Sequence, residues 1–288
     1  MTSIYKIPGY ILLLSGAFFL SWGGLLIREW EGNDIWQILF WRSFFFTNTL
    51  ILFLYLIYRK EAFSILKKSG FPGVIGGIAM AVGFTAYIFA MRETTVANVL
   101  FIISTQTIWL ALFGYLFLKE KVSLKTFLSI VLAMIGIIVM IGGSLSTGSL
   151  VGNLVALFIP INFAFLILLI RKYSKLDLVP ALFYGGLIIM FFSFFMSETI
   201  FISKHDLVVG FLLGSFQHAF GFICIVIGAR STPAVVVGLL MLVETLLGPF
   251  WVWVFLNEIP PISVFIGGSI IILAVILKTL DRKYFKAL

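Results

Sequence analysis

The chain contains a second copy of one of its own segments, displaced by 138 residues. The segment that begins at Ala90 reads AMRETTVANVLFIISTQTIWLALFGYLFLKEKV, and the segment that begins at Gly228 reads GARSTPAVVVGLLMLVETLLGPFWVWVFLNEIP. Each copy holds one apolar run between an Arg-x-Thr turn and a Leu-x-Glu end, so that Glu120 corresponds to Glu258. This duplication restricts the fold to two similar halves. We therefore expect one half at residues 1–146 and the other at residues 147–288.

The composition is that of a membrane protein. Hydrophobic residues make up 61% of the 288 residues and charged residues 11%, whereas roughly a quarter of the residues in a soluble domain are charged. Apolar runs of about 18 or more residues, the length that crosses a bilayer, recur along the whole chain. The net charge of +8 does not indicate nucleic acid, because the basic residues lie in the short connections between these runs.

Ten apolar runs predict ten transmembrane helices. They cover approximately residues 8–28, 35–57, 71–91, 95–118, 123–143, 150–170, 178–199, 207–229, 232–256 and 261–279. Sixteen of the 20 Lys and Arg residues fall on one side if the N-terminus is cytoplasmic, as the positive-inside rule requires. We therefore predict an all-α integral membrane protein with both termini cytoplasmic. Since each half has five helices, the two repeats must be inverted.

Several segments resemble the drug/metabolite transporter superfamily, EamA type. GAFFLSWGG is similar to the opening helix of that family, and QILFWRSFFF is similar to its second helix. The counterpart in the second half, PALFYGGLII, has Gly185 in place of Arg42. Two Gly-containing final helices, VLAMIGIIVMIGG and VFIGGSIIILAVIL, complete the resemblance. It implies a ten-helix transporter with a cavity lined mainly by helices 1, 3, 4, 6, 8 and 9.

Glu244 is the first candidate for a binding site because it lies near the middle of the ninth apolar run. Ionisable side chains at that depth usually face a cavity or a partner. Glu244 can bind a cationic group, carry a proton, or only hold two helices together. Its counterpart in the first repeat is Gln106, which favours a shared central site.

Aromatic residues within the runs are candidates for the wall of that site. Trp22, Tyr87 and Trp109 lie away from the interfacial belts where Trp and Tyr usually occur. Trp109 follows Gln106 by three residues and so shares its helix face. An aromatic face beside a carboxylate can hold an amine by cation–π attraction, although apolar packing is the alternative.

Four further polar residues lie within the apolar runs. Gln217 and His218 are adjacent, so only one is expected to point squarely inward, and His218 is a candidate proton carrier. Asn162 lies near Pro160, where broken backbone pairing favours a cavity. Arg42 can bind a carboxylate or brace Glu244 structurally.

Duplicated apolar helices are common in secondary transporters. We predict secondary active transport of a small polar metabolite of the amino acid or amine type, as proton-coupled export by alternating access. An importer or an uncoupled facilitator of a similar solute is left open, as is an intramembrane enzyme acting on lipid-linked substrates. No HExxH, GxSxG or Walker A motif occurs, and we predict no catalytic residues, cofactor or metal site. The expected partners are the solute and membrane lipid without nucleic acid, a homodimer is left open, and the expected location is the bacterial inner membrane.

Overall fold

The structure is a computed structural model that describes residues 3–94, 96–141, 149–257 and 262–279. Within these ranges every regular element is helical and there is no strand. The elements of the first part are η1 (Ser3–Lys6), α1 (Gly9–Leu20), α2 (Gly23–Arg28), α3 (Ile35–Tyr58), η2 (Arg59–Glu61), α4 (Ala62–Glu93), α5 (Val96–Ser104), α6 (Gln106–Leu118) and α7 (Leu124–Ile141). Those of the second part are α8 (Leu150–Ala156), α9 (Phe158–Lys172), α10 (Val179–Met196), α11 (Lys204–Phe211), η3 (Leu212–Ala219), α12 (Phe220–Ala229), α13 (Ala234–Leu256) and α14 (Ile262–Thr279).

Seven helical runs of the described chain are long and apolar enough to cross a membrane. One of them, Ile35–Glu93, has 59 residues and would be about 90 Å long as a straight helix. It is not one straight helix but comprises α3, η2 and α4. The backbone leaves the helical region at Arg59, after α3, and again at Gly70, within α4, with φ of 49° and 50°. Two shorter apolar helices lie at Leu124–Val139 and Ile262–Leu277. The protein is an integral membrane protein, and the count of ten spans remains a prediction.

The duplicated Leu-x-Glu motif ends equivalent helices in the same way. Lys119 after α6 and Asn257 after α13 both adopt the left-handed conformation, with φ of 55° at each. A left-handed residue commonly terminates a helix. The middle residue of each motif is therefore the helix stop. Glu120 follows the first stop, whereas Glu258 lies outside the described residues.

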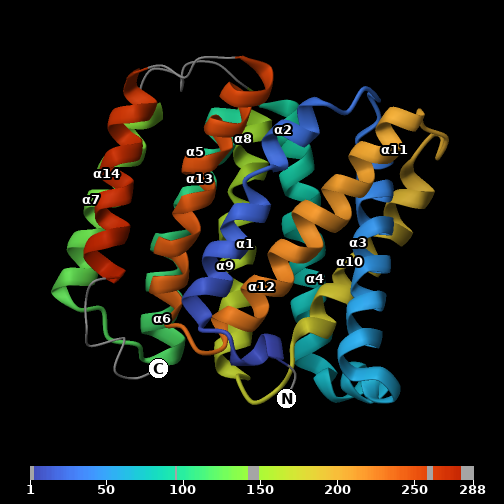
Figure 1. The fold of residues 1–288 in the computed structure, drawn as a ribbon, viewed down its shortest axis with the longest axis horizontal. Coiled ribbons are helices and arrows are strands. Elements are labelled where there is room, and N and C mark those ends of the chain that lie inside the picture. Colours follow the sequence, from blue (N-terminus) through green and yellow to red (C-terminus); the bar gives the residue numbers. More distant parts are fainter. Residues whose placement is uncertain (1–2, 95, 142–148, 258–261, 280–288) are drawn as a thin grey trace.

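The helices of the two parts of the chain interlock in one bundle (Figure 1). α4 packs against α9 and α10, while α12 packs against α1, and η3 packs against α3. α6 contacts α9, and α13 contacts α1. α7 packs against α14 at one edge of the bundle, where Figure 1 shows the two side by side.

Small residues bring α3 and η3 close together. A Cβ atom added at Gly214 would collide with the backbone carbonyl of Arg42, and one added at Gly210 would lie 3.3 Å from the Trp41 Cβ. Close helix approach in membranes commonly uses small residues at this spacing. The approach brings η3, which carries His218, against the part of α3 that carries Arg42.

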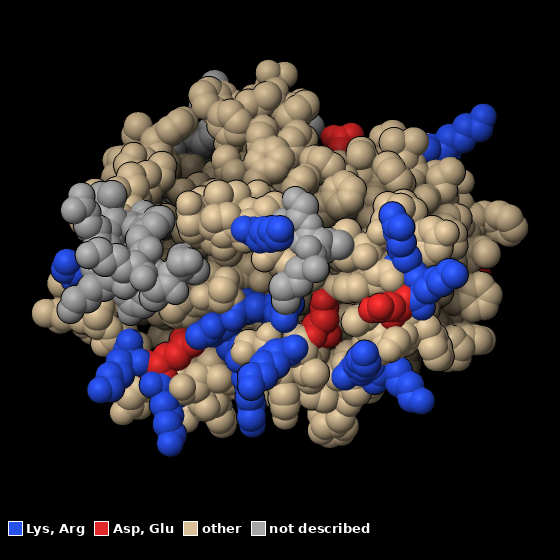
Figure 2. Space-filling model, turned by 60° about the horizontal axis from the view of Figure 1, so that its bottom comes forward, with Lys and Arg blue, Asp and Glu red and all other residues tan. Residues whose placement is uncertain are grey.

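The outer surface of the bundle is apolar, and one end of it is basic. Large side chains such as Leu52, Leu56 and Phe195 are more than half exposed, as expected for residues that face lipid. Figure 2 shows Lys and Arg gathered on the end of the bundle that is lowest in Figure 1, with few acidic residues among them.

Candidate functional site

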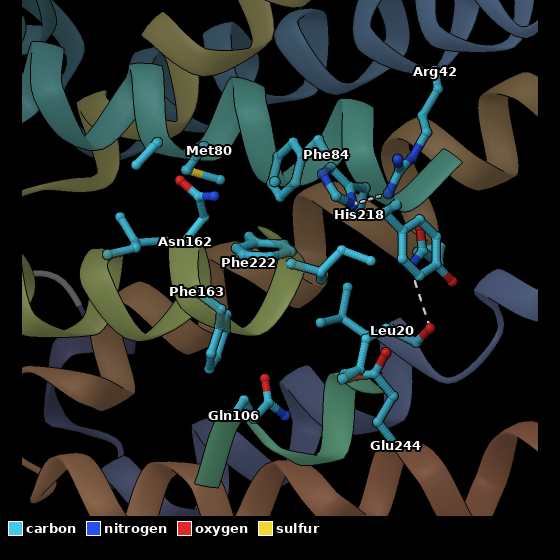
Figure 3. Close-up of a pocket in the computed structure, with 17 residues that line it drawn as sticks. Leu20, Arg42, Met80, Phe84, Gln106, Asn162, Phe163, His218, Phe222 and Glu244 are labelled. Atoms are coloured by element: carbon cyan, nitrogen blue, oxygen red, sulfur yellow. Dashed lines mark hydrogen bonds between the residues drawn. The ribbon is translucent and has the colours of Figure 1, made fainter. Parts of the chain in front are cut away.

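A cavity lies inside the bundle and offers about 70 Å³ to water-sized molecules. On this measure one water needs roughly 10–15 Å³, so the space holds a few waters or part of a small solute. Seven of the predicted site residues line it: Arg42, Tyr87, Gln106, Asn162, Gln217, His218 and Glu244 (Figure 3). The rest of the wall is apolar: Leu20, Ala79, Met80, Gly83, Phe84, Ile103, Ile159, Phe163, Leu166 and Phe222.

Three short interruptions of the helical hydrogen-bond pattern border the cavity, between α1 and α2, between α5 and α6, and between α8 and α9. The residues at these positions, Ser21, Trp22, Thr105 and Leu157, keep right-handed helical backbone angles. Leu20, Gln106 and Ile159, each next to one of these interruptions, line the cavity. The Nε2 of Gln217 donates to the Leu20 carbonyl at 3.2 Å. Backbone polar groups at membrane depth need a partner in the protein or a cavity, and Gln217 is such a partner for the Leu20 carbonyl.

Asn162 meets the expectation of a break near Pro160 in part. The break between α8 and α9 falls at Leu157, three residues before Pro160, which cannot donate a backbone hydrogen bond. The Asn162 Nδ2 donates to the Phe158 carbonyl at 2.7 Å. The side chain therefore serves the start of α9 and lines the cavity at the same time.

Arg42 and His218 make direct contact inside the bundle. The Nη2 of Arg42 lies 2.5 Å from the Nδ1 of His218, and both side chains are buried. The Arg42 guanidinium also lies 5.7 Å from the Phe84 ring and 5.4 Å from the Tyr87 ring, within the range of cation–π attraction. The resemblance implied a cavity lined mainly by helices other than the second, and Arg42 on α3, the second predicted helix, is nevertheless part of the wall.

Gln217 and His218 both line the cavity, although the sequence predicted that only one of them would point squarely inward. They lie in η3, an eight-residue π-helix. A π-helix pairs each residue with the fifth one along instead of the fourth, so its turn is wider. Two adjacent side chains can then share one wall.

Glu244 and Gln106 are both buried and come from α13 and α6. Figure 3 shows them on the side of the cavity away from Arg42 and His218. The ion pairs of the described chain do not include one between Arg42 and Glu244. The structural brace considered for Arg42 is thus formed with His218 and two aromatic rings.

Trp22 and Trp109 do not lie among the residues that line this cavity. The Trp22 ring stacks on Trp251 with centroids 4.3 Å apart, and Trp251 donates its indole N–H to the Ser21 Oγ at 2.7 Å. Trp109 packs edge-on against Phe113 at 6.1 Å. Residue type and depth cannot distinguish a cavity wall from aromatic packing, because in both cases an aromatic residue lies within an apolar span.

Phe84 and Phe222 are wall residues that the sequence reasoning missed. Their rings lie 3.8 Å and 4.9 Å from the His218 ring. Phe84 precedes Tyr87 by three residues and Phe222 follows His218 by four, so helical spacing from the predicted residues was an available signal. Apolar packing hid that signal in a chain with 32 Phe.

Glu120 joins three helices at the basic end of the bundle. Its Oε1 accepts from Arg171 Nη2 at 2.8 Å and Nε at 3.1 Å, and its Oε2 accepts from the Ala234 amide at 2.9 Å. Arg171 also donates to the Arg230 carbonyl at 3.0 Å. The carboxylate therefore connects the ends of α6 and α9 with the start of α13.

Two aspartates tie α3 and α10 together at opposite ends. Asp34 accepts from the Trp36 amide at 2.8 Å at the start of α3 and from Ser197 Oγ, also at 2.8 Å, at the end of α10. Asp177 accepts from the Val179 amide at 3.0 Å at the start of α10 and from the hydroxyl of Tyr58 at the end of α3.

Tyr5 from η1 joins the Asp177 group. Its hydroxyl donates to Asp177 Oδ2 at 2.6 Å. Burial and, next, the Asp177 carboxylate raise the pKa of Tyr5 well above its ordinary value, so the phenol stays protonated and remains a donor. The N-terminal segment is thereby fastened to the basic end of the bundle.

Glu31, His205 and Asp206 form a group with the spacing of metal ligands. One ligand atom from each lies within 4.8 Å of the others. The residues come from the α2–α3 connection and from the start of α11. The sequence reasoning did not identify this group, because Glu31 lies far from His205 and Asp206 in the chain.

Comparison with known proteins relates the chain to one family. A model of the EamA-like transporter family matches residues 7–142. An uncharacterized transporter of Clostridium kluyveri is 24% identical over 96% of this chain and 94% of that protein. A crystal structure of another protein aligns with a TM-score of 0.79 at 15% identity, over 94% of this chain and 97% of that one, and at this identity it shows the fold alone. Residues 7–142 belong to the EamA-like transporter family, and the resemblance seen in the sequence is confirmed.

Proposed function

We propose that this protein is a secondary active transporter of a small polar metabolite of the amino acid or amine type. The observation that carries the proposal is the cavity inside the bundle, which has the buried side chains of Arg42 and Glu244 in an otherwise largely apolar wall. A cationic and an anionic side chain around one small space suit a zwitterionic solute. The family match and the relative described as a transporter support the same class of function.

We further propose ten spans arranged as two inverted five-helix repeats, residues 1–146 and 147–288, with cytoplasmic termini. The helix contacts support this arrangement, because they keep their form when corresponding helices are exchanged. α1 with α12 corresponds to α4 with α9, α1 with α13 corresponds to α6 with α9, and α7 pairs with α14. Inverted repeats around a central site provide two alternative gates. The basic end seen in Figure 2 supports the orientation.

Proton coupling is assigned to Glu244. A deprotonated carboxylate attracts an ammonium group, and a protonated one releases it, so proton and solute compete for one side chain. Export is the direction we propose, with import and uncoupled passage as the other outcomes of the test. The bacterial relative supports a location in a bacterial plasma membrane.

The test is solute flux into and out of proteoliposomes under an imposed pH gradient. Glu244→Gln keeps the shape of the side chain while fixing it neutral. We expect the variant to fold as the wild type and to lose net proton-driven flux by at least about tenfold. The glutamine can neither carry a proton nor form the charge-assisted hydrogen bond to an ammonium group, which contributes roughly 1.5–3 kcal/mol to solute binding. Equal pH-driven flux in both proteins would leave Glu244 as a structural acid.

A further inference from the structure

Three residues of the cavity lining each have a buried polar atom without a hydrogen-bond partner in the described chain. The atoms are Arg42 Nε, Gln217 Oε1 and His218 Nε2, and all three residues line the cavity. A buried polar group without a partner costs about 1–3 kcal/mol, and roughly 90% or more of such groups in native proteins are paired. Three of them on one wall indicate that a polar group enters the cavity here.

The contact with Arg42 determines which hydrogen-bonding role His218 can play. A guanidinium has donors only, so His218 Nδ1 must accept in the 2.5 Å contact with Arg42 Nη2. The neutral imidazole then carries its proton on Nε2. Arg42 Nε and His218 Nε2 are therefore both free donors. This arrangement disfavours His218 as the proton carrier, because protonation at Nδ1 would break its bond to Arg42.

The charge at this end of the cavity has no carboxylate beside it. Arg42 is buried, its close contacts are His218 and the rings of Phe84 and Tyr87, and the ion pairs of the described residues do not include it. A buried charge without a counterion is strongly unfavourable. An entering anion would supply both the missing charge and the missing acceptors, and a carboxylate matches guanidinium donors in geometry.

We propose that Arg42, His218 and Gln217 form an oxyanion subsite that binds a carboxylate of the transported solute. The proposal rests on the proposed transport function and narrows its substrate class, because a plain amine would leave this wall unpaired. Arg42 Nε–H and His218 Nε2–H donate to the carboxylate. Gln217 Oε1 accepts from an N–H or O–H next to that carboxylate, and Glu244 across the cavity receives the ammonium group of a zwitterion.

The first test is thermal unfolding of the purified full-length protein with linear carboxylates from acetate to hexanoate. Primary amides and primary amines of the same chain lengths, at the same ionic strength, are the matched probes. We expect a saturable rise of the unfolding midpoint with carboxylates and a much smaller one with amides, whereas amines report separately on the Glu244 end of the cavity. No saturable stabilisation by any carboxylate, or equal stabilisation by the amides, would overturn the subsite.

Two variants of His218 separate a binding role from a structural one. His218→Gln keeps an acceptor for Arg42 and a donor for the anion, whereas His218→Leu keeps neither. We expect carboxylate affinity within about threefold of wild type for Gln and about 10- to 100-fold weaker for Leu, which is the loss of one hydrogen bond to a charged group. Arg42→Gln should weaken carboxylate binding at least as much as His218→Leu does. Asn48→Ala, at an exposed position of α3, should leave carboxylate binding unchanged. If Arg42→Gln does not fold, the His218 pair decides, and equal affinity in both His218 variants would reject the proposal.

Flux in proteoliposomes distinguishes failure of the subsite from failure of the transport function. Carboxylate binding without flux of any probe would count against transport and leave the subsite standing. Glu244-dependent flux of amines without carboxylate binding would remove the subsite and leave the transport function standing.

Discussion

Glu120 and Arg42 illustrate how single polar side chains act in this bundle. Glu120 accepts two hydrogen bonds from Arg171 and one from the Ala234 amide at the start of α13. Its carboxylate therefore holds three helices together at one end of the bundle. Arg42 contacts one nitrogen of the His218 imidazole, and the ion pairs of the described residues do not include its guanidinium. The sequence identified both residues, Glu120 through the repeat and Arg42 through its position within an apolar run, but their partners lie 51 and 176 residues away.

At the residue scale, we expect Glu120→Ala to destabilise the protein by about 1–3 kcal/mol. The substitution removes two hydrogen bonds from Arg171 and one from the Ala234 amide, and hydrogen bonds to charged groups contribute roughly 1.5–3 kcal/mol each when buried. We discount their sum because the two side chains are 19% and 23% exposed and solvent screens such pairs. Thermal or denaturant unfolding in detergent measures the change. Glu61→Ala, which removes an exposed acid in η2, is the matched control, and an equal loss in both variants would contradict the prediction.

At the scale of elements, local changes in helix geometry lie beside the cavity. The apolar runs predicted regular helices, whereas the hydrogen-bond pattern is interrupted for one or two residues within α1–α2, α5–α6 and α8–α9, and η3 is a π-helix. Two of these interruptions fall at hydroxyl residues, Ser21 and Thr105, which donate to the carbonyls of Phe18 and Ile102, and hydropathy does not report such local side-chain-to-backbone bonds. Pro160 was the one local signal used, and the nearby break falls at Leu157. At the interruption between α1 and α2, Gln217 supplies a tertiary partner for the Leu20 carbonyl.

The close approach of α3 and η3 gives a prediction at this scale. We expect Gly214→Ala to destabilise the protein by about 1–3 kcal/mol, the usual cost of overpacking, because the added methyl group would meet the Arg42 backbone and the Phe45 side chain. The separation of α3 from η3 should also weaken ligand binding at the Arg42 end. Unfolding and ligand-induced stabilisation measure the two effects.

Gly248→Ala is the control for Gly214→Ala. Gly248 lies in α13, and a Cβ there would meet its nearest neighbour at 3.7 Å, an ordinary contact. The change should lie within about 1 kcal/mol of neutral, because the gain in helix propensity is offset by the clash of the new Cβ with the ring of the following Pro249. A Gly214→Ala protein as stable as Gly248→Ala would show that the α3–η3 contact is not tight.

At the scale of the whole molecule, the two parts of the chain form one bundle instead of two separate domains. Helices of the first part pack against helices of the second part: α1 contacts α12 and α13, and α9 contacts α4 and α6. α7 and α14 pair at one edge (Figure 1). Asp34 and Asp177 make matching contacts at opposite ends of the α3–α10 pair, as an inverted arrangement would require. Neither part could bury its polar cavity residues alone, since Arg42 and Gln106 precede residue 147 while His218 and Glu244 follow it.

Membrane orientation is the prediction that belongs to this scale. Reporter fusions after Lys68 and Lys175 should read cytoplasmic, and those after Asp34 and Ser146 should read external, because the Lys and Arg residues concentrate on one side. Ser146 lies outside the described residues, so its fusion tests the sequence inference alone. A reversed signal at two of the four sites would contradict the inverted repeat.

The sequence by itself determined that the chain crosses a membrane, that it is helical, that it is duplicated and which family it resembles. These properties depend on hydropathy over about 20 residues and on internal similarity, both of which are local or additive. It also predicted seven residues that the structure brings around one cavity. Only the tertiary structure decided which of them touch, that Trp22 stacks on Trp251 away from the cavity, and that Gln217 and His218 share one wall. The physical reason is that such contacts depend on how helices far apart in the chain pack together and on local helix geometry such as the π-helix η3. A uniformly apolar sequence does not specify either of these.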